Sequence, residues 1–241
     1  MTDREINRIL DRAASVPDRV EPAVLDRIAK SIQSSLVPVQ PLPGTGVLAL
    51  RVLLVCAAIA CVGAARLGFS GFRALGLLER VTIFPALVAL MCLAARELVS
   101  YWIPASRHYL TPAVLVALAS ATLLALFGSM FHDYHVEHFL SAGVVCLSLG
   151  VAHAIPAACV AAGFLRRGLL SEVLSGTAMA GAFGGLGGVA LLELHCANLE
   201  APHILLWHVA VVPVSALLGA LVGWIINARQ TARRRHMGAG A

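Results

Sequence analysis

The stretch HILLWHVAVVPVSALLGALVGWII, residues 203–226, decides the fold of this protein. It contains 24 residues and no Asp, Glu, Lys or Arg. About 20 consecutive apolar residues are enough for a helix to cross the ~30 Å hydrocarbon core of a bilayer. A helix satisfies its own backbone hydrogen bonds, which is necessary because lipid offers the backbone no partner. The stretch therefore predicts a membrane-spanning helix.

Five further apolar runs precede this stretch and are similar to it in length. They cover residues 47–65, 82–100, 111–130, 139–165 and 173–194. The chain of 241 residues is 59% hydrophobic and only 13% charged, with a mean hydropathy of +0.84. Soluble domains carry about 25% charged residues, so this composition excludes a soluble globular protein. We predict an all-α polytopic membrane protein with six transmembrane helices in residues 47–226.

The positions of the basic residues predict how the helices are oriented. Inner-membrane proteins concentrate Lys and Arg in their cytoplasmic loops. With the N-terminus inside, thirteen of the 18 Lys and Arg residues fall on the cytoplasmic side, four of them in the basic tail 227–241. Three fall on the outer side, namely Arg66, Arg73 and Arg80. Both termini are therefore predicted to be cytoplasmic, and the net charge of +5 does not indicate a nucleic-acid partner.

Residues 1–46 form a polar head that differs from the apolar runs, with six Lys or Arg and six Asp or Glu. Two short amphipathic helices are predicted in it, followed by an extended spacer with Pro38, Pro41 and Pro43. Helices this short are marginal alone in water, so their apolar stripes need a partner: each other, the bilayer surface or another protein. The stripe residues are Ile6, Ile9, Leu10, Val24, Leu25, Ile28 and Ile32.

Histidines gather in two breaks that the predicted topology places on the outer face. Imidazole, carboxylate and thiolate are the ligands of zinc and related metals, so these residues are candidates for a divalent metal site. The same side chains also suit a membrane interface, because part of each is apolar and part is wet, and this alternative stays open. The candidate ligands are His132, His135, His138, His195 and His203.

The six cysteines divide by their predicted depth. Cys196 lies in a predicted loop, whereas the others lie in apolar runs, where Cys usually acts as a small apolar residue. Cys146 lies about seven residues into the fourth run, roughly 10 Å from the outer face. A disulfide needs Cα atoms within about 7 Å of each other. An outer redox or metal–thiolate pair of Cys146 and Cys196 therefore requires the loop to dip inward.

The remaining patterns indicate packing more than chemistry. Two Gly-x-x-x-Gly frames overlap at Gly181, Gly184, Gly185 and Gly188, and small residues let helices approach closely in lipid. The sequence contains no His-Glu-x-x-His or Gly-x-Ser-x-Gly motif, so we do not expect an enzyme.

A small metal-ion transporter or metal-binding membrane protein that uses the outer histidines is the alternative function. A transport path is expected to place several polar groups at mid-membrane, where His153 is nearly alone. For His153 itself, packing and function stay open. A haem carrier with His153 and His203 or His208 as axial ligands is disfavoured by their different depths.

The last third of the chain resembles a known family. Residues 194–196, LHC, then Pro202, Trp207 and residues 217–223, LLGALVG, are similar to the NrsF family. Its members are bacterial inner-membrane proteins with six helices that act as anti-sigma factors for ECF sigma factors. The resemblance implies that the cytoplasmic head binds the sigma factor. It also implies that Cys146 and Cys196, which match a cysteine pair of the family, sense metal or oxidative stress.

Overall fold

The computed structural model describes residues 5, 8, 22–35, 43–103, 106–136, 138–164 and 172–238, and these residues form helices and no strand. The chain divides into two compact units, Met1–Leu42 and Pro43–Ala241. The helix α2 (Pro22–Ser35) belongs to the first unit. Its apolar side chains are exposed, namely Val24, Leu25, Ile28 and Ile32. The predicted positions Ile6, Ile9 and Leu10 lie outside the described residues.

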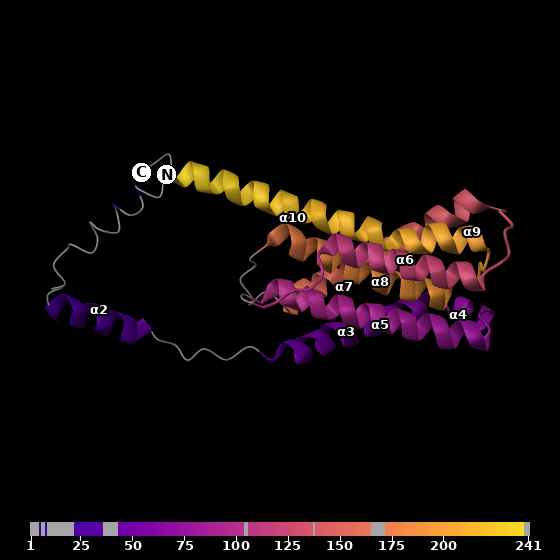
Figure 1. Cartoon of the computed structure of the whole chain (residues 1–241), viewed down its shortest axis with the longest axis horizontal. Coiled ribbons are helices and arrows are strands. Elements are labelled where there is room, and N and C mark those ends of the chain that lie inside the picture. The colour runs from indigo at the N-terminus through magenta and orange to yellow at the C-terminus, as the bar shows by residue number, and fades with distance from the viewer. Residues whose placement is uncertain are drawn as a thin grey trace. The chain divides into compact units, whose positions relative to one another are not determined.

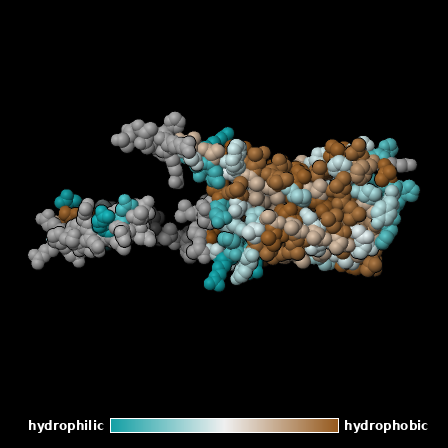
Figure 2. All heavy atoms as spheres, turned by 45° about the horizontal axis from the view of Figure 1, so that its top comes forward, coloured by the Kyte–Doolittle hydropathy of each residue, from teal (hydrophilic) through white to brown (hydrophobic). Residues whose placement is uncertain are grey.

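Within the described part of the chain, the second unit holds six helices that are long and apolar enough to cross a membrane, which confirms the predicted fold class. Five are single helices: α3 (Thr45–Leu67), α5 (Leu77–Trp102), α6 (Pro112–Met130), α7 (Phe139–Phe164) and α8 (Val173–His195). The sixth is built from α9 (Ala201–His203), the π-helical turn η1 (Ile204–His208) and α10 (Val209–Gly238). Figure 1 shows these helices side by side as a bundle. Figure 2 shows a band of hydrophobic surface on this unit, between two more hydrophilic ends.

α8 is the central helix of the bundle. Its apolar span is 83% buried inside the protein, against 22–33% for the other five helices. A methyl group at Gly184 would lie 2.6 Å from the carbonyl oxygen of Ala154 in α7. One at Gly185 would lie 2.9 Å from the Cα atom of Val212 in α10. The predicted role of these glycines in close helix packing is therefore confirmed.

The observed helices differ from the prediction in several ways, of which three affect how charged or polar segments are placed. α5 begins at Leu77, so Arg80, which was predicted in an outer break, lies inside the helix. The guanidinium of Arg80 lies 4.6 Å from the centre of the Phe72 ring. This cation–π contact stabilises the charged side chain at the start of α5. α10 runs on into the predicted tail 227–241, because Ala and Arg favour helix. The short helix α4 (Ser70–Ala74) was not predicted, since five residues show no helical period.

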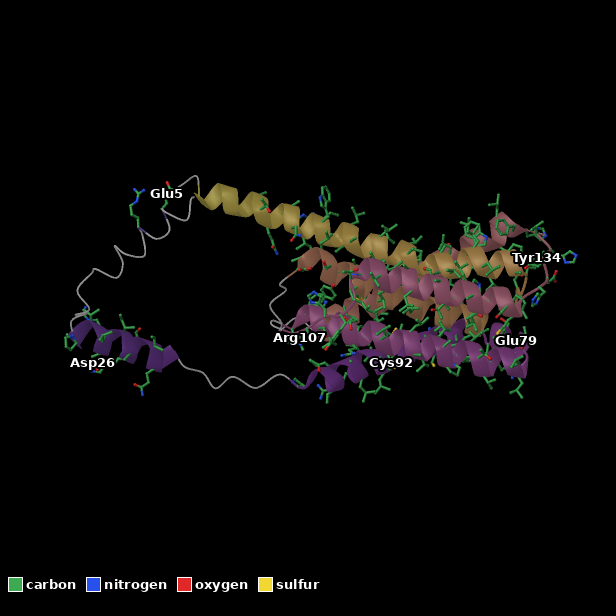
Figure 3. The ribbon with its side chains drawn as sticks, viewed as in Figure 1. Glu5, Asp26, Glu79, Cys92, Arg107 and Tyr134 are labelled. Atoms are coloured by element: carbon green, nitrogen blue, oxygen red, sulfur yellow. The ribbon has the colours of Figure 1, made fainter. Side chains whose placement is uncertain are left out.

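Polar side chains close both ends of the bundle, and Figure 3 marks the two ends by Arg107 and Tyr134. At the Arg107 end, the buried carboxylate of Glu97 accepts two hydrogen bonds from the loop between α5 and α6. The donors are the backbone N–H groups of Tyr109, at 2.9 Å, and Leu110, at 3.2 Å. These bonds hold the loop against the bundle.

Candidate functional site

The helix α4 braces the segment that follows α8, at the Tyr134 end. The Ser70 hydroxyl donates a hydrogen bond to the carbonyl oxygen of His195, and Nδ1 of His195 lies 3.1 Å from the carbonyl oxygen of Gly68. Gly71 allows a closer contact, because a methyl group there would lie 2.6 Å from the carbonyl oxygen of Cys196. The C-terminal end of α8 is therefore fixed before the chain turns.

The loop after α8 brings two cysteines together. The backbone N–H of Ala201 donates to the carbonyl oxygen of Asp133 at 2.6 Å, which ties the loop to the segment between α6 and α7. The Sγ atoms of Cys146 and Cys196 lie 3.6 Å apart, and both side chains are half-buried free thiols. The close approach that this pair requires is present, and its sensing role stays a prediction.

Two histidines at the start of the sixth helix complete the cluster. His203 and His208 are 0% and 1% exposed, and their ring centres lie 5.2 Å apart. Nε2 of His203 lies 3.6 Å from Sγ of Cys196. In an α-helix, residues five apart point in directions that differ by roughly 140°. The i→i+5 hydrogen bond of a π-helix stacks them instead, so η1 places both rings on one face.

A buried carboxylate orients the second histidine. Glu193 lies in the last turn of α8, and its Oε1 is 2.7 Å from Nδ1 of His208. Nε2 of His208 is buried and has no hydrogen-bond partner. Because the carboxylate accepts from Nδ1, it sets the tautomer and the direction of the ring.

The surroundings of Cys196 favour its thiolate form. The Cys146 thiol donates a hydrogen bond to Sγ of Cys196, and this bond lowers the pKa of Cys196. Burial opposes the shift, while the neighbouring His203 and His208 lower the pKa further. A thiolate is the form that attacks oxidants and binds metals.

Four side chains at this end can reach one ion. Cys146, Cys196, His203 and His208 each offer one ligand atom, and these atoms lie within 4.8 Å of one another. His203 was a predicted metal ligand, whereas His208 was not, and neither was its partner Glu193. No α-helical spacing rule reveals these two residues, because their meeting depends on η1 and on the packing of α8 against the sixth helix.

The structure places the other predicted ligands elsewhere. His132, His135 and His138 are exposed between α6 and α7, where His135 contacts Asp133. His195 turns toward Gly68. Among the described residues, the group that can share an ion includes none of these four histidines. The predicted set is therefore not assembled as one site, because the loop before α7 holds its histidines in solvent.

His153 lies about two turns further along α7 than Cys146 and is also outside the group. A methyl group at Gly63 in α3 would lie 2.5 Å from Cε1 of His153, so the ring fills the space beside this glycine. Nε2 of His153 is buried without a hydrogen-bond partner, so packing and function both stay open for this residue.

The chain matches a known protein family. The family model of NrsF, described as negative regulator of sigma F, matches residues 33–227. The match includes both cysteines and both histidines of the cluster and begins within α2. No curated protein and no solved structure matches the chain.

Proposed function

This chain belongs to the NrsF family of negative regulators of sigma F, and we propose that it is a membrane-bound anti-sigma factor for an ECF sigma factor. Its N-terminal head holds the sigma factor at the bacterial inner membrane. A stress signal at Cys146 and Cys196, on the periplasmic side, releases it. The separation of 3.6 Å between these sulfur atoms, at one end of a bundle long enough to cross a membrane, carries the proposed sensing role.

An exposed apolar stripe on α2 supports sigma binding by the head. Val24, Leu25, Ile28 and Ile32 are 37–54% exposed, and their spacing places them along one face of the helix. Amphipathic helices of this kind bind proteins by laying the apolar face in a groove. Ile6, Ile9 and Leu10 lie outside the described residues and belong to the proposed sigma-binding set by their sequence pattern alone.

The helices that carry the cluster supply a route for the signal. Cys146 lies in α7, Cys196 follows α8, and the two histidines begin the sixth helix. A change at the pair of sulfur atoms therefore acts on α7 and on the end of α8 together. The glycine contacts leave little free space around α8. A displacement of one helix end is therefore passed on to the neighbouring helices as a change from one packing arrangement to another. In the proposal, the switched packing has the lower affinity for the sigma factor.

Capture of a sigma factor by the full-length protein tests this function. The wild-type protein, purified in detergent from its host membrane, is expected to carry an ECF sigma factor with it. Leu25→Glu places a charge in the apolar stripe and is expected to abolish the capture. Gln33→Glu adds the same charge on another face of α2 and is expected to preserve it.

Equal capture by Leu25→Glu and Gln33→Glu would contradict sigma binding through α2. A wild-type protein that captures no sigma factor, while intact and monodisperse, would contradict the anti-sigma function itself. Both outcomes are read from the same purification, so the two parts of the proposal are tested separately.

A further inference from the structure

We propose that Cys146, Cys196, His203 and His208 form a tetrahedral site for a thiophilic divalent cation, with Glu193 as the residue that orients His208. The inference deepens the proposed function, because binding of the cation would be the signal that releases the sigma factor. Only this signalling role rests on the proposed function. Binding itself follows from the side chains that meet at the Tyr134 end and can be measured without a sigma factor.

The spacing of the ligand atoms fits a tetrahedral ion. Zn–S bonds are about 2.3 Å and Zn–N bonds about 2.0–2.1 Å, which sets S···S at about 3.8 Å and S···N at about 3.6 Å across a tetrahedron. The two sulfur atoms lie 3.6 Å apart, and Sγ of Cys196 lies 3.6 Å from Nε2 of His203. All four ligand atoms lie within 4.8 Å of one another, so side-chain shifts of about 1 Å complete the geometry.

The nitrogen that would complete this tetrahedron has no other partner. Nε2 of His208 is buried without a hydrogen bond, in a side chain that is 1% exposed. An unsatisfied buried polar atom is unfavourable, and such an atom calls for a ligand or a functional explanation. A cation held by the neighbouring thiolates satisfies this nitrogen.

The contact between Glu193 and His208 is the one that metal-bound histidines make. A ligating histidine almost always donates its second N–H to a carboxylate or carbonyl, which fixes the ring and strengthens it as a ligand. Oε1 of Glu193 lies 2.7 Å from Nδ1 of His208, which leaves Nε2 for the cation. The carboxylate is 2% exposed, so water does not compete for this contact.

The donor set selects the class of cation. Two sulfur and two imidazole nitrogen atoms suit Zn²⁺ and its heavier relative Cd²⁺, whereas Mg²⁺ and Ca²⁺ require oxygen ligands. Four protein ligands close the coordination shell, as in structural zinc sites, and leave no place for a reacting water. A bound cation therefore ties together α7, the end of α8 and the start of the sixth helix.

Titration of the purified full-length protein with Co²⁺ tests the site, because the Co²⁺ spectrum reports its ligands. One Co²⁺ per chain is expected, with the visible bands of tetrahedral geometry and a sulfur-to-cobalt charge-transfer band. Zn²⁺ and Cd²⁺ are expected to displace it. Cys196→Ser and His208→Asn are each expected to weaken binding at least 100-fold. Glu193→Gln keeps all four ligands and is expected to weaken binding 10–100-fold with the band preserved.

Two matched controls use a cysteine and a histidine outside the cluster. Cys92→Ser and His135→Asn each remove an exposed residue of the same type, and both are expected to bind Co²⁺ as the wild type does. Binding without a charge-transfer band, or binding that Cys196→Ser and His208→Asn leave unchanged, would overturn the inference.

A measurement on the wild type covers the case of variants that do not fold. Cys146 and Cys196 are expected to be alkylated in the metal-free protein, and Zn²⁺ is expected to protect both, as mapped by mass spectrometry. Absence of this protection would overturn the site. Sigma capture is measured on the metal-free protein. Capture by a protein that then binds no cation rejects the cation site alone, and cation binding by a protein that captures no sigma factor when metal-free rejects the anti-sigma function alone.

Discussion

Two glutamates are buried at opposite ends of the six-helix unit, and their partners differ in kind. Glu97, 1% exposed, accepts two backbone N–H groups from the loop before α6. Glu193, 2% exposed, contacts Nδ1 of His208, whose other ring nitrogen has no partner. Burial therefore does not by itself mark a functional carboxylate. What distinguishes Glu193 is that it contacts a histidine whose other ring nitrogen is unpaired and lies beside two thiols.

The largest expected effect is a loss of signalling at the Tyr134 end. Cys196→Ser removes the sulfur that lies closest to both Cys146 and His203, so release of the sigma factor is expected to be abolished. A reporter that depends on the sigma factor, in cells exposed to Cd²⁺ or a thiol oxidant, measures the release. Cys92→Ser, which changes an exposed cysteine of α5, is expected to respond like the wild type. Full induction in Cys196→Ser would contradict the proposed sensor.

The largest expected loss of stability belongs to the Arg107 end. Glu97→Ala leaves two backbone N–H groups without their acceptor, at about 1–3 kcal/mol for each group that stays unsatisfied. Glu97→Gln keeps an acceptor oxygen and is expected to lose less than half as much. Thermal unfolding in detergent measures both variants. If Glu97→Ala were as stable as the wild type, the clamp on Tyr109 and Leu110 would have no structural role.

The same conservative substitution at the other end sharpens the comparison. Glu193→Gln is expected to change the free energy of unfolding by less than about 1 kcal/mol, because its side-chain oxygen still accepts a hydrogen bond from Nδ1 of His208. Its expected effect is on cation affinity, where the lost negative charge weakens the ligand. Glu97→Gln is expected to leave cation affinity unchanged. Equal affinities in the two variants would remove the distinction between the two ends.

The six helices could be predicted from the sequence because the thickness of the bilayer dictates their length. The resemblance carried by residues 194–196, Pro202 and Trp207 is confirmed by the family match over residues 33–227. Glycine spacing likewise predicted the close packing of α8. These are properties of length, composition and local pattern, which a single sequence contains.

The cluster could be predicted only in part. Cys146, Cys196 and His203 were candidates, but His208 joins them through the π-helical turn, and an α-helix would turn it away from His203. His132, His135 and His138 were predicted metal ligands because they lie close together in the sequence. Among the described residues, the structure does not bring them into the group that can share an ion. Spacing in a loop does not determine which side chains turn inward, whereas tertiary packing does.

An acid and a histidine also meet on the surface of the Tyr134 end. The exposed Asp133 and His135 form a hydrogen bond, which raises the pKa of His135 and lowers the pKa of Asp133. Because the pKa of His135 is raised, its contribution to the free energy of unfolding is fully present below its unfolded-state pKa. That contribution is lost as pH rises through the pKa of the folded state. Because the pKa of Asp133 is lowered, its contribution to the free energy of unfolding is lost as pH falls through its pKa in the folded state. The contact is therefore strongest at pH values between the folded-state pKa of Asp133 and that of His135.

The smallest expected effect is a shift in this titration. Asp133→Asn is expected to lower the pKa of His135, because the hydrogen bond and the charge of Asp133 are the main causes of its rise. Glu200→Gln removes a weaker attraction and is expected to lower it less. NMR of labelled histidine measures both shifts, and only a small loss of stability is expected because solvent screens an exposed pair. An unchanged His135 pKa in Asp133→Asn would mean that this pair does not form in solution. Burial would then be what makes an acid–histidine contact persist, as it does between Glu193 and His208.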